Sequence, residues 1–173
     1  MEEQIEIEET PKRKRSLIII GAITLLIILL PAFLTTPTSR NTLSGLLESS
    51  TLDNLRIRNT DIPVYITQEV NQKLLKFYNQ NVGLEFKACL KGYIENNSYF
   101  INDIYQPKHF SQTVNQVIAE PCNSEDLISL HSHPRPHCLP SQQDLQNHEK
   151  MKKLNPDILL AVMCTENRLN IYN

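Results

Sequence analysis

An uncharged run near the N-terminus, 17-LIIIGAITLLIILLPAFL-34, constrains this chain more than any other feature. A helix rises 1.5 Å per residue, so 18 to 20 residues reach about 27–30 Å, enough to cross the hydrocarbon core of a membrane. The apolar region of a cleaved signal peptide is usually shorter, at about 7–15 residues. We therefore expect residues 16–35 to form a transmembrane helix, in preference to a buried core helix.

Basic residues precede this run and are scarce after it. The stretch 12-KRKR-15 ends where the apolar residues begin, and the nearest cation on the other side is Arg40. Because positive charge is retained on the cytoplasmic side, we expect a cytoplasmic tail at residues 1–15 and an extracytoplasmic position for the rest of the chain. Residues 36–62 are rich in Thr, Ser and Asn, and we interpret them as a linker.

The overall charge argues against a nucleic-acid partner. The chain holds 17 Lys and Arg against 19 Asp and Glu, which gives a formal net charge of −2. Nucleic-acid-binding domains usually carry a basic patch or a basic helix face, and the sequence after the membrane segment has neither. We therefore expect no nucleic acid among the partners.

Residues 63–173 are expected to form a single α/β domain. Alternating and helical patterns predict the order β-α-β-β-β-α-β-β, which is typical of a mixed β-sheet with flanking helices. The expected strands are 64–67, 84–95 with a turn near Gly92, 98–105, a weaker one at 114–120, 127–133, and a pair within 157–173 joined at Glu166–Asn167; the expected helices are 68–81 and Ser141 to about Leu154.

Two histidines stand at i, i+2 in the expected strand 127–133. Side chains two residues apart leave the same face of a strand, so His131 and His133 point together while Ser132 points the other way. If the chain turns back after the strand and a helix begins at Ser141, Asp144 lies one turn into that helix and near the strand end. Two histidines and one carboxylate leave a fourth tetrahedral position open, as in catalytic zinc sites.

Ser141 and Asp144 share a helix face and allow two interpretations. Ser-x-x-Asp is a common N-terminal capping pair, and taken alone we would favour capping. With two histidines directly upstream, we favour a place in the site for both residues. The serine hydroxyl can also stabilise the oxyanion of a tetrahedral intermediate, so the two roles are compatible.

These positions resemble a known family motif. The spacing His-x-His-x7-Ser-x2-Asp matches that of the JAMM (MPN+/JAB) zinc metallopeptidases, which also carry an upstream glutamate in a segment of the form Glu-x-x-x-Leu/Cys-Leu-x-Gly. Here that segment is 85-EFKACLKG-92. The resemblance covers about residues 63–173 and implies a cytidine-deaminase-like JAB/MPN fold. It further implies Zn²⁺ held by His131, His133 and Asp144, with Glu85 as general base and Ser141 supporting the oxyanion.

The resemblance implies hydrolysis of a peptide or isopeptide bond by a zinc-activated water. Family members remove ubiquitin and ubiquitin-like proteins, so a ubiquitin-like conjugate is the expected protein substrate, although the motif does not select between the two kinds of bond. The domain lacks obvious insertions and is similar to the compact prokaryotic and archaeal members. An exported domain conflicts with a ubiquitin-like substrate. A catalytically inactive MPN-type scaffold that binds proteins at the membrane is the alternative.

The four cysteines carry separate expectations. If the domain is exported, a disulfide between Cys138 and Cys164 is plausible, and zinc ligation by Cys138 is the alternative. Cys89 falls in an apolar strand and is interpreted as a small core residue, while Cys122 lies in a loop and is interpreted as free.

Three further histidines lack the motif spacing: His109, His137 and His148. His137 lies in the loop near the expected metal site, where contact with substrate is possible, but a surface position is favoured.

Overall fold

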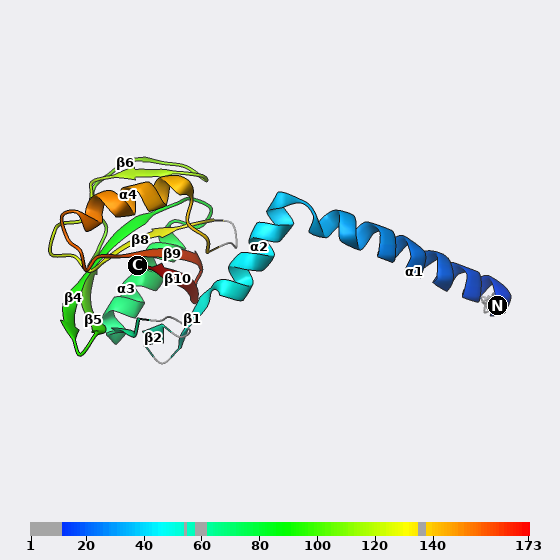
Figure 1. Cartoon of the computed structure of the whole chain (residues 1–173), viewed down its shortest axis with the longest axis horizontal. Coiled ribbons are helices and arrows are strands. Elements are labelled where there is room, and N and C mark those ends of the chain that lie inside the picture. The colour runs from blue at the N-terminus through cyan, green and yellow to red at the C-terminus, as the bar shows by residue number, and fades with distance from the viewer. Residues whose placement is uncertain (1–11, 54, 58–61, 135–137) are drawn as a thin grey trace, which may run out of the picture. The chain divides into compact units, whose positions relative to one another are not determined.

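Helix α1 (Lys12–Leu34) contains the apolar run and continues through Pro31 near its end. The structure is a computed structural model, and it describes residues 12–53, 55–57, 62–134 and 138–173 (Figure 1). Residues 14–34 are long and apolar enough to cross a membrane, a criterion that an N-terminal signal helix also meets. The chain divides into two units at Arg40, within α2 (Pro37–Glu48). Of the expected tail at residues 1–15, residues 1–11 lie outside the described part and the rest begin α1.

Eight strands of the second unit join into one closed sheet, in the order β1-β10-β9-β8-β4-β5-β3-β2. The pairs β3–β5 and β8–β9 are parallel and the other neighbours are antiparallel, so the predicted mixed sheet is confirmed. The strands are β1 (Ser50–Asp53), β2 (Arg56–Ile57), β3 (Val64–Ile66), β4 (Lys87–Glu95), β5 (Ser98–Tyr105), β8 (Ile128–Ser132), β9 (Leu159–Thr165) and β10 (Arg168–Tyr172).

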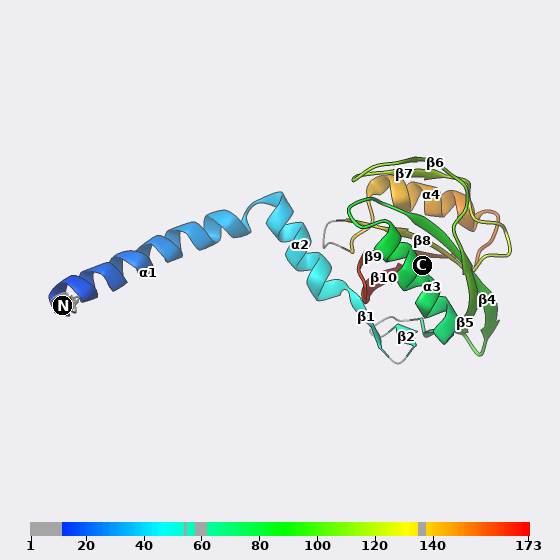
Figure 2. The same ribbon diagram turned by 180° about the vertical axis from the view of Figure 1, so that it is seen from behind.

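Helices α3 (Gln68–Gln80) and α4 (Gln142–Lys152) lie on different sides of these strands. Figures 1 and 2 are opposite views, and α4 is in front of the strands in one while α3 is in front in the other. Helix α3 is capped by the Thr67 side chain and buries Val70 and Leu74 in the core. A fully buried side chain of this kind contributes about 1.5–3 kcal/mol, so α3 is held mainly by its apolar face.

A separate hairpin covers the segment that leads into β4. It consists of β6 (His109–Gln112) and β7 (Val117–Ala119), of which the sequence predicted only a weak strand at 114–120. The backbone N–H of Glu85 donates to the carbonyl of Thr113 at 2.9 Å, and Gln112 Nε2 donates to Asn81 Oδ1 at 2.6 Å. These bonds fix the hairpin beside the start of β4, and both views show it next to α4.

Residues predicted as a linker, 36–62, contain regular structure. Helix α2 takes up most of their first half, and β1 and β2 pair with β10 and β3 to close the sheet. Ile57 is buried in the core, although its strand has only two residues. Segments this short carry no readable alternation, so their pairing depends on partners far away in the sequence; residues 54 and 58–61 lie outside the described part.

Gly92 marks a β-bulge, and the turn predicted near it is wrong. Strand β4 continues to Glu95 with a register shift at Lys91/Gly92, and the turn follows at Asn96 and Asn97, whose φ values are 48° and 60°. Two consecutive positive φ values suit the tight turn of a hairpin. A Cβ at Gly92 would collide with the carbonyl oxygen of Phe100, so this position requires glycine for the close approach of two strands.

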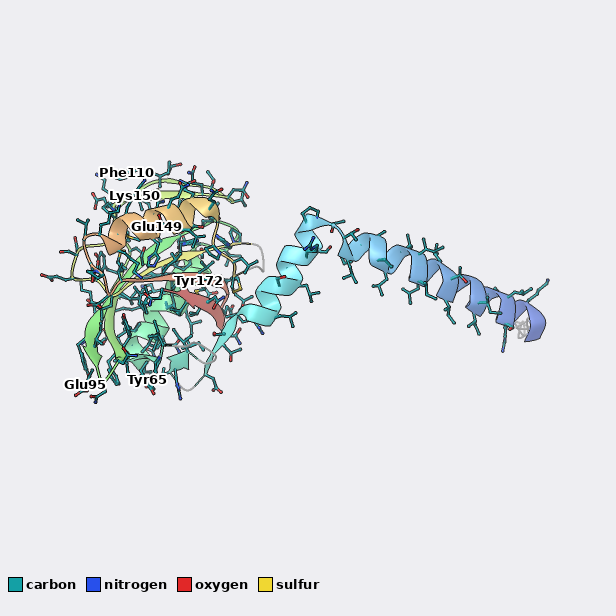
Figure 3. All side chains as sticks on the ribbon, viewed as in Figure 1. Tyr65, Glu95, Phe110, Glu149, Lys150 and Tyr172 are labelled. Carbon is teal, nitrogen blue, oxygen red and sulfur yellow. A yellow bond between two sulfur atoms is a disulfide. The ribbon has the colours of Figure 1, made fainter. Side chains whose placement is uncertain are left out.

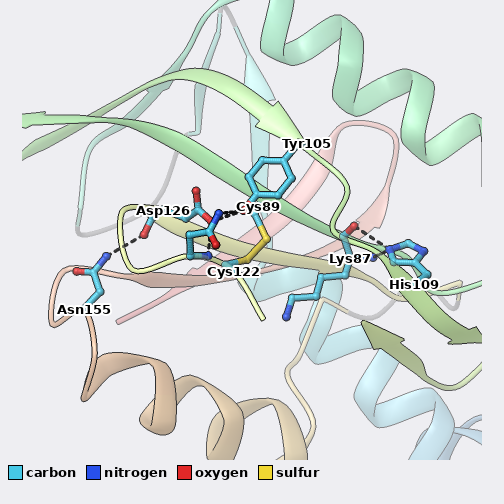
Figure 4. Close-up of a disulfide and its surroundings, with 8 residues drawn as sticks. Lys87, Cys89, Tyr105, His109, Cys122, Asp126 and Asn155 are labelled. Atoms are coloured by element: carbon cyan, nitrogen blue, oxygen red, sulfur yellow. Dashed lines mark hydrogen bonds between the residues drawn. A yellow bond between two sulfur atoms is a disulfide. The ribbon is translucent and has the colours of Figure 1, made fainter. Parts of the chain in front are cut away.

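Two disulfides cross-link the domain. Cys138 is bonded to Cys164, as the sequence suggested for an exported domain, so its sulfur is not free to bind a metal. The second bond joins Cys89 to Cys122 and corrects two expectations, a reduced core residue and a free cysteine (Figure 4). Cys89 is buried as expected, but its partner lies 33 residues away in a loop that the sequence did not place next to β4.

Candidate metal centre

Strand β8 presents the two histidines as alternation predicts. His131 is the next-to-last residue of β8 and His133 follows its end; both are buried. Ser132 faces the opposite side, where its Oγ accepts a hydrogen bond from the backbone N–H of Phe86 at 2.9 Å. The backbone of His133 is held in turn, because its N–H donates to the carbonyl of Met163 at 2.7 Å. Bonds to both neighbouring segments therefore set the direction of the two imidazoles.

Asp144 meets the two imidazoles from helix α4. The Nε2 atoms of His131 and His133 are 3.1 Å apart, and Asp144 Oδ2 lies 3.2 Å from the first and 3.9 Å from the second. Ligand atoms bound to zinc at 2.0–2.1 Å in a tetrahedron lie roughly 3.3 Å apart. The structure thus brings these three residues together at separations that fit a tetrahedral metal ion.

A second group with metal-binding side chains, Cys89, Cys122 and Asp126, does not offer the same chemistry. Its two sulfurs are bonded to each other, so neither is available as a thiolate. Asp126 accepts hydrogen bonds from the hydroxyl of Tyr105 and the backbone N–H of Asn123, both at 2.6 Å (Figure 4). This group is therefore a structural anchor for the loop before β8.

Ser141 caps helix α4, which is the alternative that the sequence left open. Its Oγ accepts from the backbone N–H of Asp144 at 3.2 Å, and its own N–H donates to Asp144 Oδ2 at 2.7 Å, so both halves of a capping box are present. The Ser141 hydroxyl also donates to the same carboxylate oxygen at 2.6 Å. The cap therefore aims Asp144 at the histidines, and such a cap typically stabilises a helix by about 1 kcal/mol.

Hydrogen bonds around Asp144 keep its carboxylate charged. Burial alone would raise the pKa of Asp144, but the bonds from His131 and Ser141 outweigh it and hold that pKa well below its usual range. A charged carboxylate is the form that binds a metal ion.

Glu85 lies beside this cluster without joining it. It precedes β4, its side chain is only 12 % exposed, and its Oε1 is 4.0 Å from His133 Nε2. Burial raises the pKa of Glu85 to about 7, with Asp144 adding to the rise and His131 opposing it. A carboxyl group that exchanges protons near neutral pH is suited to general acid and base catalysis.

The five predicted site residues line one cleft of about 330 Å³. Residues of β4 and β8 form its floor. Residues of α4, of β7 and of the segments on either side of β7 form its walls. Figure 3 labels Lys150, a lining residue on α4, and Phe110, which lies on the hairpin. The cleft is therefore large enough for a few residues of a polypeptide substrate.

Lys87 is among the lining residues that the sequence analysis did not consider. Alternation along β4 was the available signal, because positions 85 and 87 leave the same face of an extended chain. His109 also has a role here, since its Nε2 lies 3.2 Å from the carbonyl oxygen of Lys87 and ties β6 to β4. His148 is buried on α4 and is not among the cleft residues, while His137 lies outside the described part.

Comparisons with known proteins give a structural likeness only. No protein-family model matches this sequence, and neither does any curated protein. The chain is similar in structure to a JAB1/MPN domain protein from Archaeoglobus fulgidus, with 21% identity, a TM-score of 0.40, and coverage of 62% of this chain and 87% of that one.

A second similar structure is described as "JAMM: A Metalloprotease-like Zinc Site in the Proteasome and Signalosome". It has 21% identity, a TM-score of 0.40, and coverage of 62% of this chain and 84% of that one. The function of this protein therefore rests on its own site residues.

Proposed function

We propose that this protein is a membrane-anchored zinc metallopeptidase that hydrolyses peptide or isopeptide bonds. One observation carries the proposal: the ligand atoms of His131, His133 and Asp144 converge in a cleft, and the carboxyl group of Glu85 lies 4.0 Å from one of them. Two imidazoles and a carboxylate are one of the ligand sets of catalytic zinc, and such a set leaves a fourth position open for water or substrate.

The residues of the cleft have separate roles in hydrolysis. Zinc held by His131, His133 and Asp144 would act as a Lewis acid, which would polarise the substrate carbonyl and lower the pKa of a water molecule to about 7. Glu85 accepts a proton from the attacking water, whose oxygen forms a bond to the carbonyl carbon. The C–N bond then breaks, and Glu85 returns the proton to the departing amine. For Ser141 to support the oxyanion, its hydroxyl must turn from Asp144 to the substrate oxygen.

The proposed topology bears on the substrate. Structural disulfides persist in oxidising compartments and are rare in the cytosol, so the bonds Cys89–Cys122 and Cys138–Cys164 support an extracytoplasmic domain. The basic stretch 12-KRKR-15 at the start of α1 supports the same orientation. We therefore favour a protein substrate outside the cytoplasm, with a ubiquitin-like conjugate as the candidate if the domain faces the cytoplasm.

Zinc content and a substrate panel test the function. We expect the full-length protein in detergent to hold one equivalent of zinc by elemental analysis and to cleave at least one substrate class, because ligands and base are preassembled. The panel consists of plain peptides, linear ubiquitin-like fusions and isopeptide-linked conjugates, with products identified by mass spectrometry. A zinc-loaded, folded protein that cleaves none of them would instead support the inactive scaffold.

A reporter fused after Asn173 tests the orientation. We expect a reporter that is active only outside the cytoplasm to give signal, and one that is active only inside to give none. The matched control replaces 12-KRKR-15 by uncharged residues, which should weaken the orientation bias because the retained charge is lost. Cytoplasmic signal from the unaltered chain would contradict both the topology and the argument from the disulfides.

A further inference from the structure

Lys87 occupies the floor of the cleft next to the metal centre. It stands two residues after Glu85, and in the antiparallel pairing of β4 with β8 its Cα partner is His131. Both side chains line the same cleft. Residues two apart in a strand are separated by about 6.6 Å, so the ammonium group lies within reach of the substrate residues adjoining the bond to be cleaved.

The Lys87 ammonium has no carboxylate partner among the residues that the structure describes. The ion pairs found there involve other groups, such as Lys73 with Glu69 and Asp103. The side chain is partly buried, and in Figure 4 it extends from the β4 ribbon on the side of α4, with only its backbone joined to His109. A partly buried charge without a counter-charge is costly, and an anionic ligand would offset that cost.

Charge elsewhere in the cleft points the same way. The acidic residues that line it are Glu85 and Asp144, and both belong to the metal centre. Away from that centre the lining contains Lys150 and several carboxamide side chains, and no carboxylate. Among the described lining residues outside the metal centre, the charged side chains are therefore those of Lys87 and Lys150.

We propose that Lys87 determines substrate specificity by binding a carboxylate that lies within about two residues of the scissile bond. This inference rests on the proposed peptidase function and names the substrate class of that site. The carboxylate has two possible sources, an acidic side chain or the free C-terminus of the substrate. A charge-assisted bond of this kind is strong enough to change binding by about tenfold or more.

Paired peptides measure the preference directly. Each pair differs by Asp against Asn at one position on either side of the scissile bond, and a further pair has a free or an amidated C-terminus. For the zinc-loaded full-length protein in detergent, we expect kcat/KM to be at least about tenfold higher for the acidic member at one of these positions. Which pair responds identifies the source of the carboxylate.

Variants assign the preference to this side chain. Lys87→Gln should reduce the ratio of kcat/KM for the acidic and neutral peptides to about one. Lys87→Glu should invert the charge preference, so that a peptide with lysine at the same position is favoured over the acidic one. A purely structural role would not produce this inversion. Lys91→Gln is the matched control, because Lys91 lies on the same strand outside the cleft, and it should leave the ratio unchanged. A ratio near one in the unaltered protein, or a ratio that survives in Lys87→Gln, overturns the proposal.

Binding separates this proposal from the proposed function. Dissociation constants for the same peptides, measured by fluorescence anisotropy on the Glu85→Gln protein, do not require hydrolysis. If the unaltered protein cleaves nothing but Lys87-dependent preference remains in binding, the peptidase function fails and the role of Lys87 stands. If cleavage occurs with no acidic preference in either measurement, the peptidase function stands and the role of Lys87 is refuted.

Discussion

Replacing His131 with alanine is expected to abolish stoichiometric zinc binding and, with it, all hydrolysis. His131 Nε2 lies 3.1 Å from His133 Nε2 and 3.2 Å from Asp144 Oδ2. Its removal therefore leaves the metal centre with two protein ligands in place of three. Loss of residues that merely support ligands costs about 10- to 100-fold in metal affinity, and loss of a ligand should cost more. Elemental analysis and zinc titration of the full-length protein measure the effect.

An isosteric variant separates the loss of metal binding from a loss of the fold. Asp144→Asn keeps the size of the side chain and an oxygen for the cap with Ser141, but removes the charge that favours a metal ion. It should weaken zinc binding while circular dichroism remains unchanged. Asp103→Asn makes the same substitution at an exposed acid on β5 and should retain zinc. Full zinc occupancy in His131→Ala would show that the metal binds elsewhere or that another ligand replaces this one.

Glu85→Gln is expected to retain zinc and to lose about 10²- to 10⁴-fold in kcat, the usual contribution of a general base. The glutamine side chain matches glutamate in size but cannot accept a proton from water. Because burial raises the pKa of Glu85 to about 7, activity of the unaltered protein should fall as pH decreases through that region. A bound cation favours the charged carboxylate, so the fall should lie at or below pH 7.

A glutamate at the opposite end of the same strand provides the control. Glu95 is exposed at the end of β4, away from the cleft (Figure 3), and Glu95→Gln should leave kcat and its pH dependence unchanged. The acidic limb of the pH profile should be absent from whatever activity Glu85→Gln retains. Unchanged kcat in Glu85→Gln would remove this residue from the mechanism, and loss of zinc would make it a ligand.

Local patterns predicted the parts of the site that are close in sequence. Strand β8 was recognisable from its apolar run, and alternation placed His131 and His133 on one face. The start of α4 was recognisable from Ser141, because a helix leaves its first N–H groups without partners and a serine before it can accept from one of them. These features depend on residues within one or two turns of each other, so the sequence contains the information needed to place them.

Local patterns did not predict contacts between residues far apart in the sequence. The closure of the sheet by β1 and β2 and the Cys89–Cys122 bond depend on a partner strand or loop far away in the chain. The strands of the hairpin β6–β7 pair locally, but its position beside Glu85 depends on the backbone bond between Glu85 and Thr113, which are far apart in the sequence. Pairing of this kind reflects the total packing of the domain, in which many alternative partners have similar local preferences.

The sequence by itself determined an apolar segment able to span a membrane, a mixed α/β domain and the five residues proposed for catalysis. Strand alternation and helix capping, which act over a few residues, indicated that His131, His133 and Asp144 could meet, and the resemblance to the JAMM motif implied the role of Glu85. Only the tertiary structure decided that Asp144 Oδ2 comes within 3.2 Å of His131, that Glu85 stays buried beside the metal centre, and that Lys87 faces the same cleft. Each of these depends on how β4, β8 and α4 pack, since burial and separation are properties of the assembled domain.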